Sequence, residues 1–536
     1  MPIVMNKIPK LLETLDPTAA KAQAAEWITE NAAFLRTAID RHKEWIADAE
    51  VEKYQEAYDG YLDAIEKRDK DRDDGINHKL QVNYAQTIID TVVDYLLGKS
   101  PVWTVEADQD EDKPSDEILE AYRKDIVKLL RSEDAKRVLS EQLRQGSIAG
   151  YSAALVWVNE FGEIDFDEFP VQEMFPIFDT KGRIRLMIRY YTVESDDPVA
   201  VGNDPTKVEI YDARYITYAI TDDTGQGFQL DEDELETGNP IEHKAGRVPG
   251  SLFINGTPAR YEKRKIKAGS SDLGNGVYSL LEALAHALSD KANSVDRLLD
   301  QFLLLTNVDT DKKEVSRMRK TRSIVLKSKE SKAQFLSQSQ DDNAVQNFKN
   351  DLKEAIYDMT NTPRLNDISG ATATEIKMRY APLDIKASKK ETYFMSAIKQ
   401  LGAVLTDMLN YKRLVEAGVS DPYAVLQGTT DSAVELYKAH WLQPGLNRNL
   451  PQNNKEIAEI VQMLYDKVPD TFLYELLWFA DDPKQMLKDM VAQRKDRAEA
   501  AATASAASLF GSSEFASTQQ QTKTEEGDDK GGANND

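Results

Sequence analysis

The sequence predicts an α+β fold that is predominantly helical, and three observations lead to this expectation. Apolar residues recur every three or four positions over long stretches on both sides of a central block. Within that block, residues 151–255, β-rich runs are separated by turns of Gly, Asp and Pro. The length of 536 residues also exceeds the size at which a single core stops growing, so several domains are expected.

The N-terminal part is expected to be helical. Apolar residues at three-to-four spacing predict a helix over 19–66, and the charged run at 66–75 is expected to be a loop. A second helix is predicted across 77–103, with an apolar face that stops at Gly98. A further helix is expected at about 115–148.

The central block should contain antiparallel strands. FGE at 161–163 and TKGR at 180–183 are typical hairpin turns between apolar runs. Residues 221–240 form a polar connector, and GRVPGSLFING ends the block. We therefore expect a β-rich region between two helical regions.

A second helical region follows. Residues 277–303 contain no Gly or Pro, and as a helix they would span about 40 Å. A second helix is predicted at 341–361, and a short module between the two, 304–339, contains the strand-like runs SIVLK and KAQFL. Both helices carry heptad-like apolar stripes suited to packing against another long helix; the stripes are Leu281, Leu284, Leu288, Val295, Leu298 and Phe302 in the first and Val345, Phe348, Leu352, Ile356 and Met359 in the second.

The C-terminal region is expected to be helical over 385–497, with interruptions near Pro422, Pro444 and Pro451. From 498 to 536 the sequence changes to Ala/Ser, then Gln/Thr, then acidic residues with Gly. Such a segment cannot bury enough apolar surface to fold, so a disordered tail is expected.

Composition limits the possible partners. The chain has 92 acidic and 67 basic residues, a net charge of −25, whereas tight nucleic-acid binding relies on Lys and Arg. The whole chain is therefore not expected to hold DNA tightly, although DNA could still pass by it. No run approaches the roughly 20 apolar residues of a membrane span, and the N-terminus lacks the pattern of a signal peptide. The chain has no cysteine, which excludes disulfides and thiolate sites and is compatible with the cytoplasm.

No catalytic, metal or cofactor site is expected. A phosphate-binding loop around GKS at 98–100 would need Gly at position 93, which is Val, and Pro101 follows directly. A calcium loop counted from Asp69 would end at Leu80 where Glu is needed. The five histidines are scattered without metal-binding spacing. These segments are better explained as a helix end, a solvated loop and structural residues.

Two local features remain. Residues 309–332 include nine bases and four acids, so this part of the short module carries five net positive charges within an acidic chain. Such a run is usually a solvated face, but its position between two long helices also favours a docking surface for an acidic partner or DNA. The second feature is the stretch TNTPRLNDISGATATEIKMRY (360–380), where a polar loop separates two long helical patterns.

These motifs, in this order, resemble those of a known family. Over roughly residues 40–490 the chain is similar to the portal proteins of long-tailed double-stranded DNA bacteriophages, of the type best known from Gram-positive hosts. His78, Ser100 and Thr374 depart from the family pattern. The segments that carry the resemblance are NHKLQVNYAQTIIDTVVDYLLGKSPVW, GYSAALVWVNEFGEIDFDEFPVQEMFPIFD, HKAGRVPGSLFING, LSDKANSVDRLLDQFLLL, SGATATEIKMRYAPL, NLPQNNKEIAEIV and DDPKQMLKDM.

The resemblance implies a portal fold that assembles into a ring, typically of twelve subunits, around a central channel. It implies the following regions: wing 1–276, stem helices 277–303 and 340–361, clip 304–339, tunnel loop 362–370, a long helix behind the channel at 371–400, crown 401–497 and disordered tail 498–536. The tunnel loop that would face DNA comprises Pro363, Arg364, Leu365, Asn366, Asp367, Ile368, Ser369 and Gly370. The clip docking surface would comprise Lys312, Lys313, Arg317, Arg319, Lys320 and Arg322.

The same resemblance implies function and partners. The ring would sit at one capsid vertex of the virion, after assembly in the host cytoplasm, and double-stranded DNA would be packaged and ejected through it without sequence specificity. Its other partners would be the terminase large subunit, head-completion or adaptor proteins, and the major capsid and scaffolding proteins, with no membrane. No enzymatic activity, cofactor or metal is implied.

Two other classes of protein remain open from the residues alone. A terminase or nuclease subunit would need a phosphate-binding loop or a carboxylate metal cluster, and neither pattern occurs. An internal scaffolding protein would be helical throughout, and the β-rich stretch at 151–255 argues against it.

Overall fold

A computed structural model gives the fold as two compact units, residues 1–450 and 451–536. The first unit mixes helices and strands, as the α+β expectation requires, whereas the described residues of the second unit contain helices without strands. The described residues are 3–4, 17–69, 76–107, 114–131, 133–193, 204–222, 225, 227–231, 238–256, 269–299, 302–306, 311–313, 316–317, 332–336, 342–363, 373–449, 454–465, 467–475 and 486–500.

The prediction of one continuous helix over 19–66 is wrong. The structure has three helices, α1 (Pro17–Asp48), α2 (Val51–Tyr58) and α3 (Asp63–Glu66). Glu50 (φ +53°) and Gly60 (φ +89°) have left-handed backbone conformations, which end a right-handed helix. The apolar period continues across these breaks, so periodicity alone did not indicate them.

The helix predicted over 77–103 is shorter than expected. Helix α4 (Tyr84–Leu97) begins where the Asn83 side chain accepts a hydrogen bond from the Gln86 amide at 3.1 Å, and it ends at Gly98 as predicted. The preceding residues, 76–83, have no regular structure, and β2 (Val102–Val105) follows. The strand β2 forms because its partner β14 (Leu442–Gly445) arrives from the far end of the first unit.

The helix predicted at 115–148 is also divided. Helix α5 (Asp116–Leu130) begins after Ser115, whose hydroxyl accepts a hydrogen bond from the Ile118 amide. Helix α6 (Glu133–Ala149) follows and packs against the three-stranded sheet described next.

The β-rich block is confirmed and consists of two sheets. The larger has the order β1-β5-β6-β7-β8-β10 with β9 added to β8, and the smaller has the order β11-β3-β4. Both predicted hairpin turns are present, at Gly162 (φ +79°) and Gly182 (φ +80°). The strands are β1 (Ile3–Val4), β3 (Tyr151–Val158), β4 (Ile164–Phe169), β5 (Met174–Phe178), β6 (Ile184–Thr192), β7 (Thr206–Tyr211), β8 (Tyr215–Thr221), β9 (Phe228–Leu230), β10 (Ile241–Glu242) and β11 (Gly250–Ile254).

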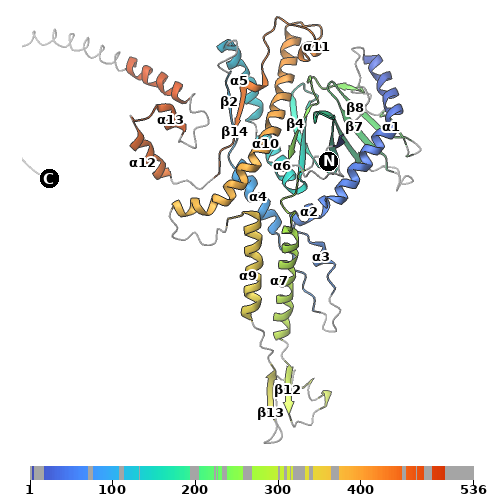
Figure 1. Cartoon of the computed structure of the whole chain (residues 1–536), viewed down its shortest axis with the longest axis vertical. Helices are drawn as coiled ribbons and strands as arrows, with labels where there is room; N and C mark the ends of the chain where they lie inside the picture. The colour runs from blue at the N-terminus through green and yellow to red at the C-terminus, as the bar shows by residue number, and fades with distance from the viewer. Residues whose placement is uncertain are drawn as a thin grey trace, which may run out of the picture. The chain divides into compact units, whose positions relative to one another are not determined.

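The paired long helices are confirmed, with one correction. Helices α7 (Val277–Leu299) and α9 (Asp342–Thr360) lie side by side, and the ribbon of β12 (Phe302–Thr306) and β13 (Lys332–Leu336) continues from their ends (Figure 1). The first helix ends before the predicted 303, because Phe302 pairs with Leu336 in the ribbon. KAQFL is the predicted strand, whereas SIVLK lies outside the described residues.

A 44-residue helix, α10 (Ala373–Glu416), joins the hairpin to the rest of the first unit. It packs against β11, and Phe394 of α10 meets Phe253 of β11 edge to face with ring centroids 5.2 Å apart. The helix runs through position 400, so the expected boundary between 371–400 and 401–497 falls inside it. The short elements α11 (Pro422–Leu426) and η3 (Ala439–Trp441) then lead to β14.

The second unit contains α12 (Asn454–Leu464), α13 (Asp470–Glu475) and helical residues 486–500. The segment expected as a tail is therefore helical at its start, and 501–536 lies outside the described residues. Among the described helices, none combines the length and the apolar character needed to cross a membrane.

Glu168 of β4 is a partly buried acid that should make stability depend on pH. Its Oε1 has no hydrogen-bond partner, and burial, with the nearby charges of Glu141 and Asp167, raises its pKa to about 8. Between its unfolded pKa near 4.5 and about 8 the folded state retains a proton that the unfolded state releases, so stability falls as pH rises through this window. We expect Glu168→Gln to stabilise the chain by about 1–3 kcal/mol at pH 8 and to change little at pH 4.5.

Thermal unfolding measured at both pH values checks this expectation. The control is Glu30→Gln, which alters an exposed residue of α1 and should leave the midpoint within about 1 °C of the parent. Equal shifts for Glu168→Gln at the two pH values would contradict it.

Candidate functional site: the α7–α9 hairpin and its junction with α10

The root of the α7–α9 hairpin is held by an extended segment from the N-terminal region. The Leu80 amide donates to Ser289 Oγ at 3.0 Å, and the His78 amide donates to Asn293 Oδ1 at 2.7 Å. Ser289 and Asn293 lie one turn apart on α7, and both are buried. The side-chain oxygens of two polar residues on an otherwise apolar helix face thereby accept hydrogen bonds from backbone amides more than 200 residues away.

Charged groups fix the same contact. The guanidinium of Arg68, which is buried, forms an ion pair with Asp290 and donates to the His286 carbonyl at 3.4 Å. His78 Nε2 is hydrogen-bonded to Asp296. Ser289, Asp290 and Asn293 of LSDKAN (288–293) are therefore positioning residues for the hairpin, a role that the sequence alone did not indicate.

The apolar stripes of the hairpin divide into a buried and an exposed part. Leu281 and Leu284 of α7 and Leu352 and Ile356 of α9 are buried in the core of the first unit. Phe348 of α9, by contrast, leaves 53% of its surface exposed. Two further stripe members are similarly exposed: Met359 at 50% and Val295 at 47%. A single chain thus covers only part of the stripe that the sequence predicted.

The end of α9 is a rigid turn. Asn361 takes a left-handed conformation (φ +54°), and the Thr362 amide donates back to the Tyr357 carbonyl at 3.1 Å. The hydroxyls of Thr360 and Thr362 are 2.9 Å apart and buried. Lys386 Nζ of α10 donates to the Thr360 carbonyl at 3.1 Å, so α10 holds the point from which the chain leaves α9.

A buried ionic cluster lies beside this turn. Asp272 Oδ2 is 2.9 Å from Lys390 Nζ and 3.1 Å from Lys386 Nζ, and its Oδ1 accepts from Asn255 Nδ2 at 2.9 Å. Lys390 also donates to Ser147 Oγ at 2.7 Å. The cluster therefore links α6, the end of β11, the segment before α7, and α10.

The electrostatics of the cluster keep both partners charged at neutral pH. Burial by itself would raise the pKa of Asp272, but Lys390, Lys386 and Asn255 outweigh it and hold that pKa well below its usual range. Burial lowers the pKa of Lys390 to about 8, although Asp272 opposes this change. Asp272 and Lys390 therefore form an ion pair at the hairpin junction at neutral pH.

Residues of HKAGRVPGSLFING also have structural roles. His243 is buried; its Nδ1 accepts from the Ala245 amide at 3.1 Å, and its Nε2 lies 3.1 Å from the Asp212 carbonyl. Burial lowers its pKa to about 3, so the ring is neutral with the proton on Nε2. Asn255 joins this segment to Asp272 of the ionic cluster.

The structure describes part of each predicted functional surface. Lys312, Lys313 and Arg317 lie in the segment between β12 and β13 and are exposed, whereas Arg319, Lys320 and Arg322 lie outside the described residues. Pro363 follows the turn that ends α9. The other predicted tunnel-loop residues, Arg364, Leu365, Asn366, Asp367, Ile368, Ser369 and Gly370, also lie outside the described residues.

The segments that resemble catalytic or metal-binding motifs either have structural roles or lie outside the described residues. Gly98 of GKS ends α4, and its carbonyl accepts from Lys136 Nζ at 3.1 Å. Most of the charged loop that imitates a calcium site, 70–75, lies outside the described residues. Within the described part of the chain, no group of three His, Asp or Glu residues could hold a metal ion.

Two comparisons with known proteins cover most of the chain. The family model described as "Phage portal protein, SPP1 Gp6-like" matches residues 40–500, which include the β-rich block, the hairpin and α10. The portal protein of Bacillus phage SPP1 is 23% identical over 370 residues, which cover 66% of this chain and 66% of that protein. The match thus spans just under two thirds of that relative.

Proposed function

Because this chain belongs to the SPP1 Gp6-like family of phage portal proteins, we propose that identical copies of it form a ring through which double-stranded DNA enters and leaves the capsid. Membership places the protein in the virion, at the capsid vertex, as a structural component and not an enzyme. The observation that carries the proposal is the family match across 40–500, combined with a long helix hairpin whose apolar stripe is half exposed.

We assign the regions of the ring to the chain as follows. The wing is 1–276, α7 and α9 form the stem, and the module between them is the clip. The tunnel loop is 362–370, and α10 begins behind it. The crown begins within α10 at 401 and extends to 497.

The half-exposed stripe supports the ring. Phe348 and Met359 are already about half buried, so covering the rest of each side chain by a neighbouring subunit gains about half of the ~1.5–3 kcal/mol of full burial. The stem helices of adjacent subunits would then share one continuous apolar seam. Twelve subunits is the number that we expect from the family.

The excess of acidic residues supports a channel that does not bind DNA tightly. Each phosphate neutralised by a base adds affinity, so a conduit must keep basic contacts few. The chain carries 92 acids against 67 bases, and the clip contains nine bases and four acids between positions 309 and 332. We infer that DNA slides past mostly acidic walls and meets the tunnel loop at the narrowest point.

The partners follow from the same assignment. We propose that the clip binds the terminase large subunit during packaging and head-completion or adaptor proteins afterwards. The wing and crown would contact the major capsid and scaffolding proteins while the virion assembles in the host cytoplasm. No cofactor or metal is part of this proposal.

Electron microscopy of the purified protein in negative stain tests the central claim. Rings with a central channel are expected. Monomers or rods at micromolar concentration would overturn the proposal, since a portal cannot work as a single subunit.

Charge reversal in the clip should separate docking from assembly. We expect Lys312→Glu, Lys313→Glu and Arg317→Glu together to leave rings intact, because these exposed residues lie in the module beyond the stem helices. The affinity of the ring for the terminase large subunit should fall at least tenfold, since each reversal replaces an attraction by a repulsion. Binding measured by surface plasmon resonance, together with DNA packaging in vitro, checks this result.

The matched control reverses Arg494, Lys495 and Arg497, three exposed bases of the helical residues 486–500. This variant has the same change in net charge and should bind terminase as the parent does. Unchanged packaging by the first variant would count against the clip assignment.

A further inference from the structure

The turn between β3 and β4 presents an exposed aromatic side chain on a rigid support. Phe161 is 80% exposed, the most exposed of the large apolar residues in the described part of the chain. The Asn159 side chain accepts hydrogen bonds from the amides of Phe161 at 3.0 Å and Glu163 at 2.9 Å, and donates to Asp165 at 2.9 Å. The turn is therefore preorganised to hold a phenyl ring in water, and a partner that covers the ring would gain free energy from its burial.

Acidic residues surround this aromatic ring. Glu160 and Glu163 flank Phe161 in sequence, and both are exposed. Within the described residues, neither glutamate forms an ion pair. We call the turn with Phe161, Glu160 and Glu163 the knob.

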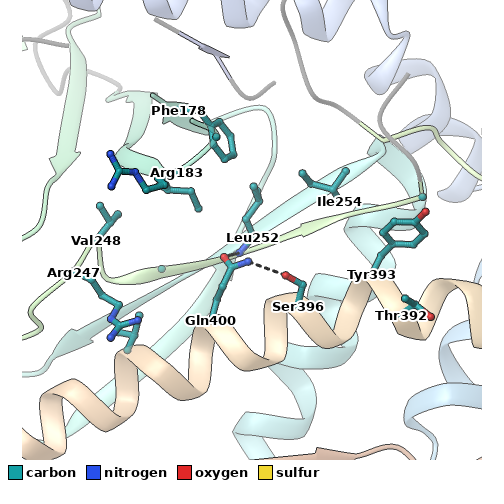
Figure 2. Close-up of a pocket in the computed structure, with 15 residues that line it drawn as sticks. Phe178, Arg183, Arg247, Val248, Leu252, Ile254, Thr392, Tyr393, Ser396 and Gln400 are labelled. Carbon is teal, nitrogen blue, oxygen red and sulfur yellow. Dashed lines mark hydrogen bonds between the residues drawn. The ribbon is translucent and has the colours of Figure 1, made fainter. Parts of the chain in front are cut away.

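An apolar cavity of about 710 Å³ lies between β11, the β5–β6 turn and α10 (Figure 2). Its apolar walls include Phe178, Leu252 and Ile254, and α10 adds Tyr393 and Ser396. The Leu252 amide donates to Gln400 Oε1 at 3.2 Å, which fixes the floor of the cavity to the helix. A cavity of this size accepts one aromatic side chain together with part of the turn that carries it.

The charge of the cavity is opposite to that of the knob. Of the described residues that line it, the charged ones are Arg183 and Arg247, and both are about half exposed. Each already bonds one carboxylate of its own chain, Asp179 and Asp407 respectively. A guanidinium has five N–H donors, so each arginine can still donate hydrogen bonds to a second carboxylate.

Knob and cavity occupy separate places on one small sheet. In the order β11-β3-β4, the cavity adjoins the edge strand β11, whereas the knob is the turn at the end of strands β3 and β4. Two separate complementary surfaces of one subunit allow a head-to-tail contact, and its repetition gives a ring when the rotation between subunits closes.

We propose that Phe161 of one subunit inserts into the cavity between β11 and α10 of its neighbour, with Glu160 and Glu163 facing Arg183 and Arg247. The occupant of the cavity is thus a second copy of this chain. This inference rests on the proposed ring function and adds to it a specific contact between the β-rich regions.

The absence of cysteine from the chain allows a direct test. The doubly substituted variant Phe161→Cys/Ser396→Cys places one thiol on the knob and one in the cavity wall, in the full-length chain. Assembled rings are oxidised with copper phenanthroline and separated on a denaturing gel without reductant. We expect a ladder of covalent multimers, because every subunit contributes one thiol to each of its two neighbours.

The matched control replaces Ser396→Cys by Lys412→Cys, an exposed position roughly 24 Å further along the same helix. It should remain monomeric on the gel. Mixed rings of the two single variants, Phe161→Cys and Ser396→Cys, should give covalent dimers only. A ladder from the control, or no ladder from the first pair in rings seen by microscopy, would overturn the contact.

A second variant keeps the test independent of cysteine geometry. Phe161→Ser should raise the protein concentration at which rings dissociate at least tenfold, whereas Phe161→Leu should change it less than threefold, since leucine still fills the cavity. Equal dissociation of Phe161→Ser and parent rings would refute the contact and leave the portal assignment intact. Failure of the parent to form rings would instead refute the proposed function.

Discussion

Replacement of Asp272 by alanine is expected to destabilise the first unit by about 3–5 kcal/mol. Asp272 balances two lysines at the junction of the α7–α9 hairpin with α10, and Lys390 is buried. Without the carboxylate, Lys390 must either stay charged in a nonpolar environment or lose its proton, and both cost free energy. Urea denaturation followed by far-UV circular dichroism should show a lower midpoint for the first transition.

A surface ion pair provides the control for this result. Arg123 and Glu120 form a bidentate pair on α5 at 2.7 and 3.0 Å, and the Glu120 side chain is 65% exposed. Glu120→Ala should cost no more than about 0.5–1 kcal/mol, because water screens the pair. Equal effects of the two alanine variants would contradict the view that Asp272 stabilises the hairpin junction by balancing the charges of Lys386 and Lys390.

Partial repair distinguishes charge from shape. Asp272→Asn/Lys390→Met removes the carboxylate and one buried ammonium together, and it should recover part of the stability lost in Asp272→Ala. Lys386 is less buried than Lys390 and can reach water after the change. A double variant less stable than Asp272→Ala would show that hydrogen bonds to Ser147 and Asn255 matter more than charge balance.

Replacement of Phe348 by glutamate is expected to prevent ring assembly while the single chain stays folded. Phe348 belongs to the exposed part of the α9 stripe, so its loss removes little packing within one chain. In the proposed ring the same position is covered by a neighbour, and a buried unpaired carboxylate there is unfavourable. The fraction of protein in rings, measured by analytical ultracentrifugation, should fall at least tenfold.

Ile356, two turns further along the same helix, is the matched opposite case. It is fully buried inside the chain, so Ile356→Ala should cost about 2–5 kcal/mol in the free energy of unfolding of the single chain. Phe348→Leu should preserve both folding and rings. Normal rings from Phe348→Glu would mean that the exposed stripe does not lie between subunits.

Local patterns in the sequence predicted much of the fold correctly. The hairpin turns at Gly162 and Gly182, the end of α4 at Gly98 and the paired helices α7 and α9 were all expected. These features depend on neighbouring residues alone: a glycine that allows positive φ, or an apolar period of three to four. The order of the family motifs was also sufficient to identify the family that the comparisons found.

Two interruptions of the predicted helices were not expected from the sequence, because local patterns do not indicate them. Glu50 adopts a left-handed conformation although glutamate does not favour it, because the packing of α1 and α2 requires the turn there. The strand β2 was predicted as the end of a helix, since its partner β14 lies more than 330 residues later. A strand needs a partner, and sequence spacing does not show which segment supplies it.

The class of fold, the helical and β-rich regions and the family of the chain could all be predicted from its residues. The roles of the motif residues became visible in the folded chain, where Ser289 and Asn293 bind the segment at 78–80, and Asp272 joins Lys386 and Lys390. The tertiary structure also decided which part of the α9 stripe the chain covers itself and which part it leaves for a neighbour. The physical reason is that propensity and period act between residues a few positions apart, whereas burial, charge balance and hydrogen bonding depend on residues brought together from distant parts of the chain.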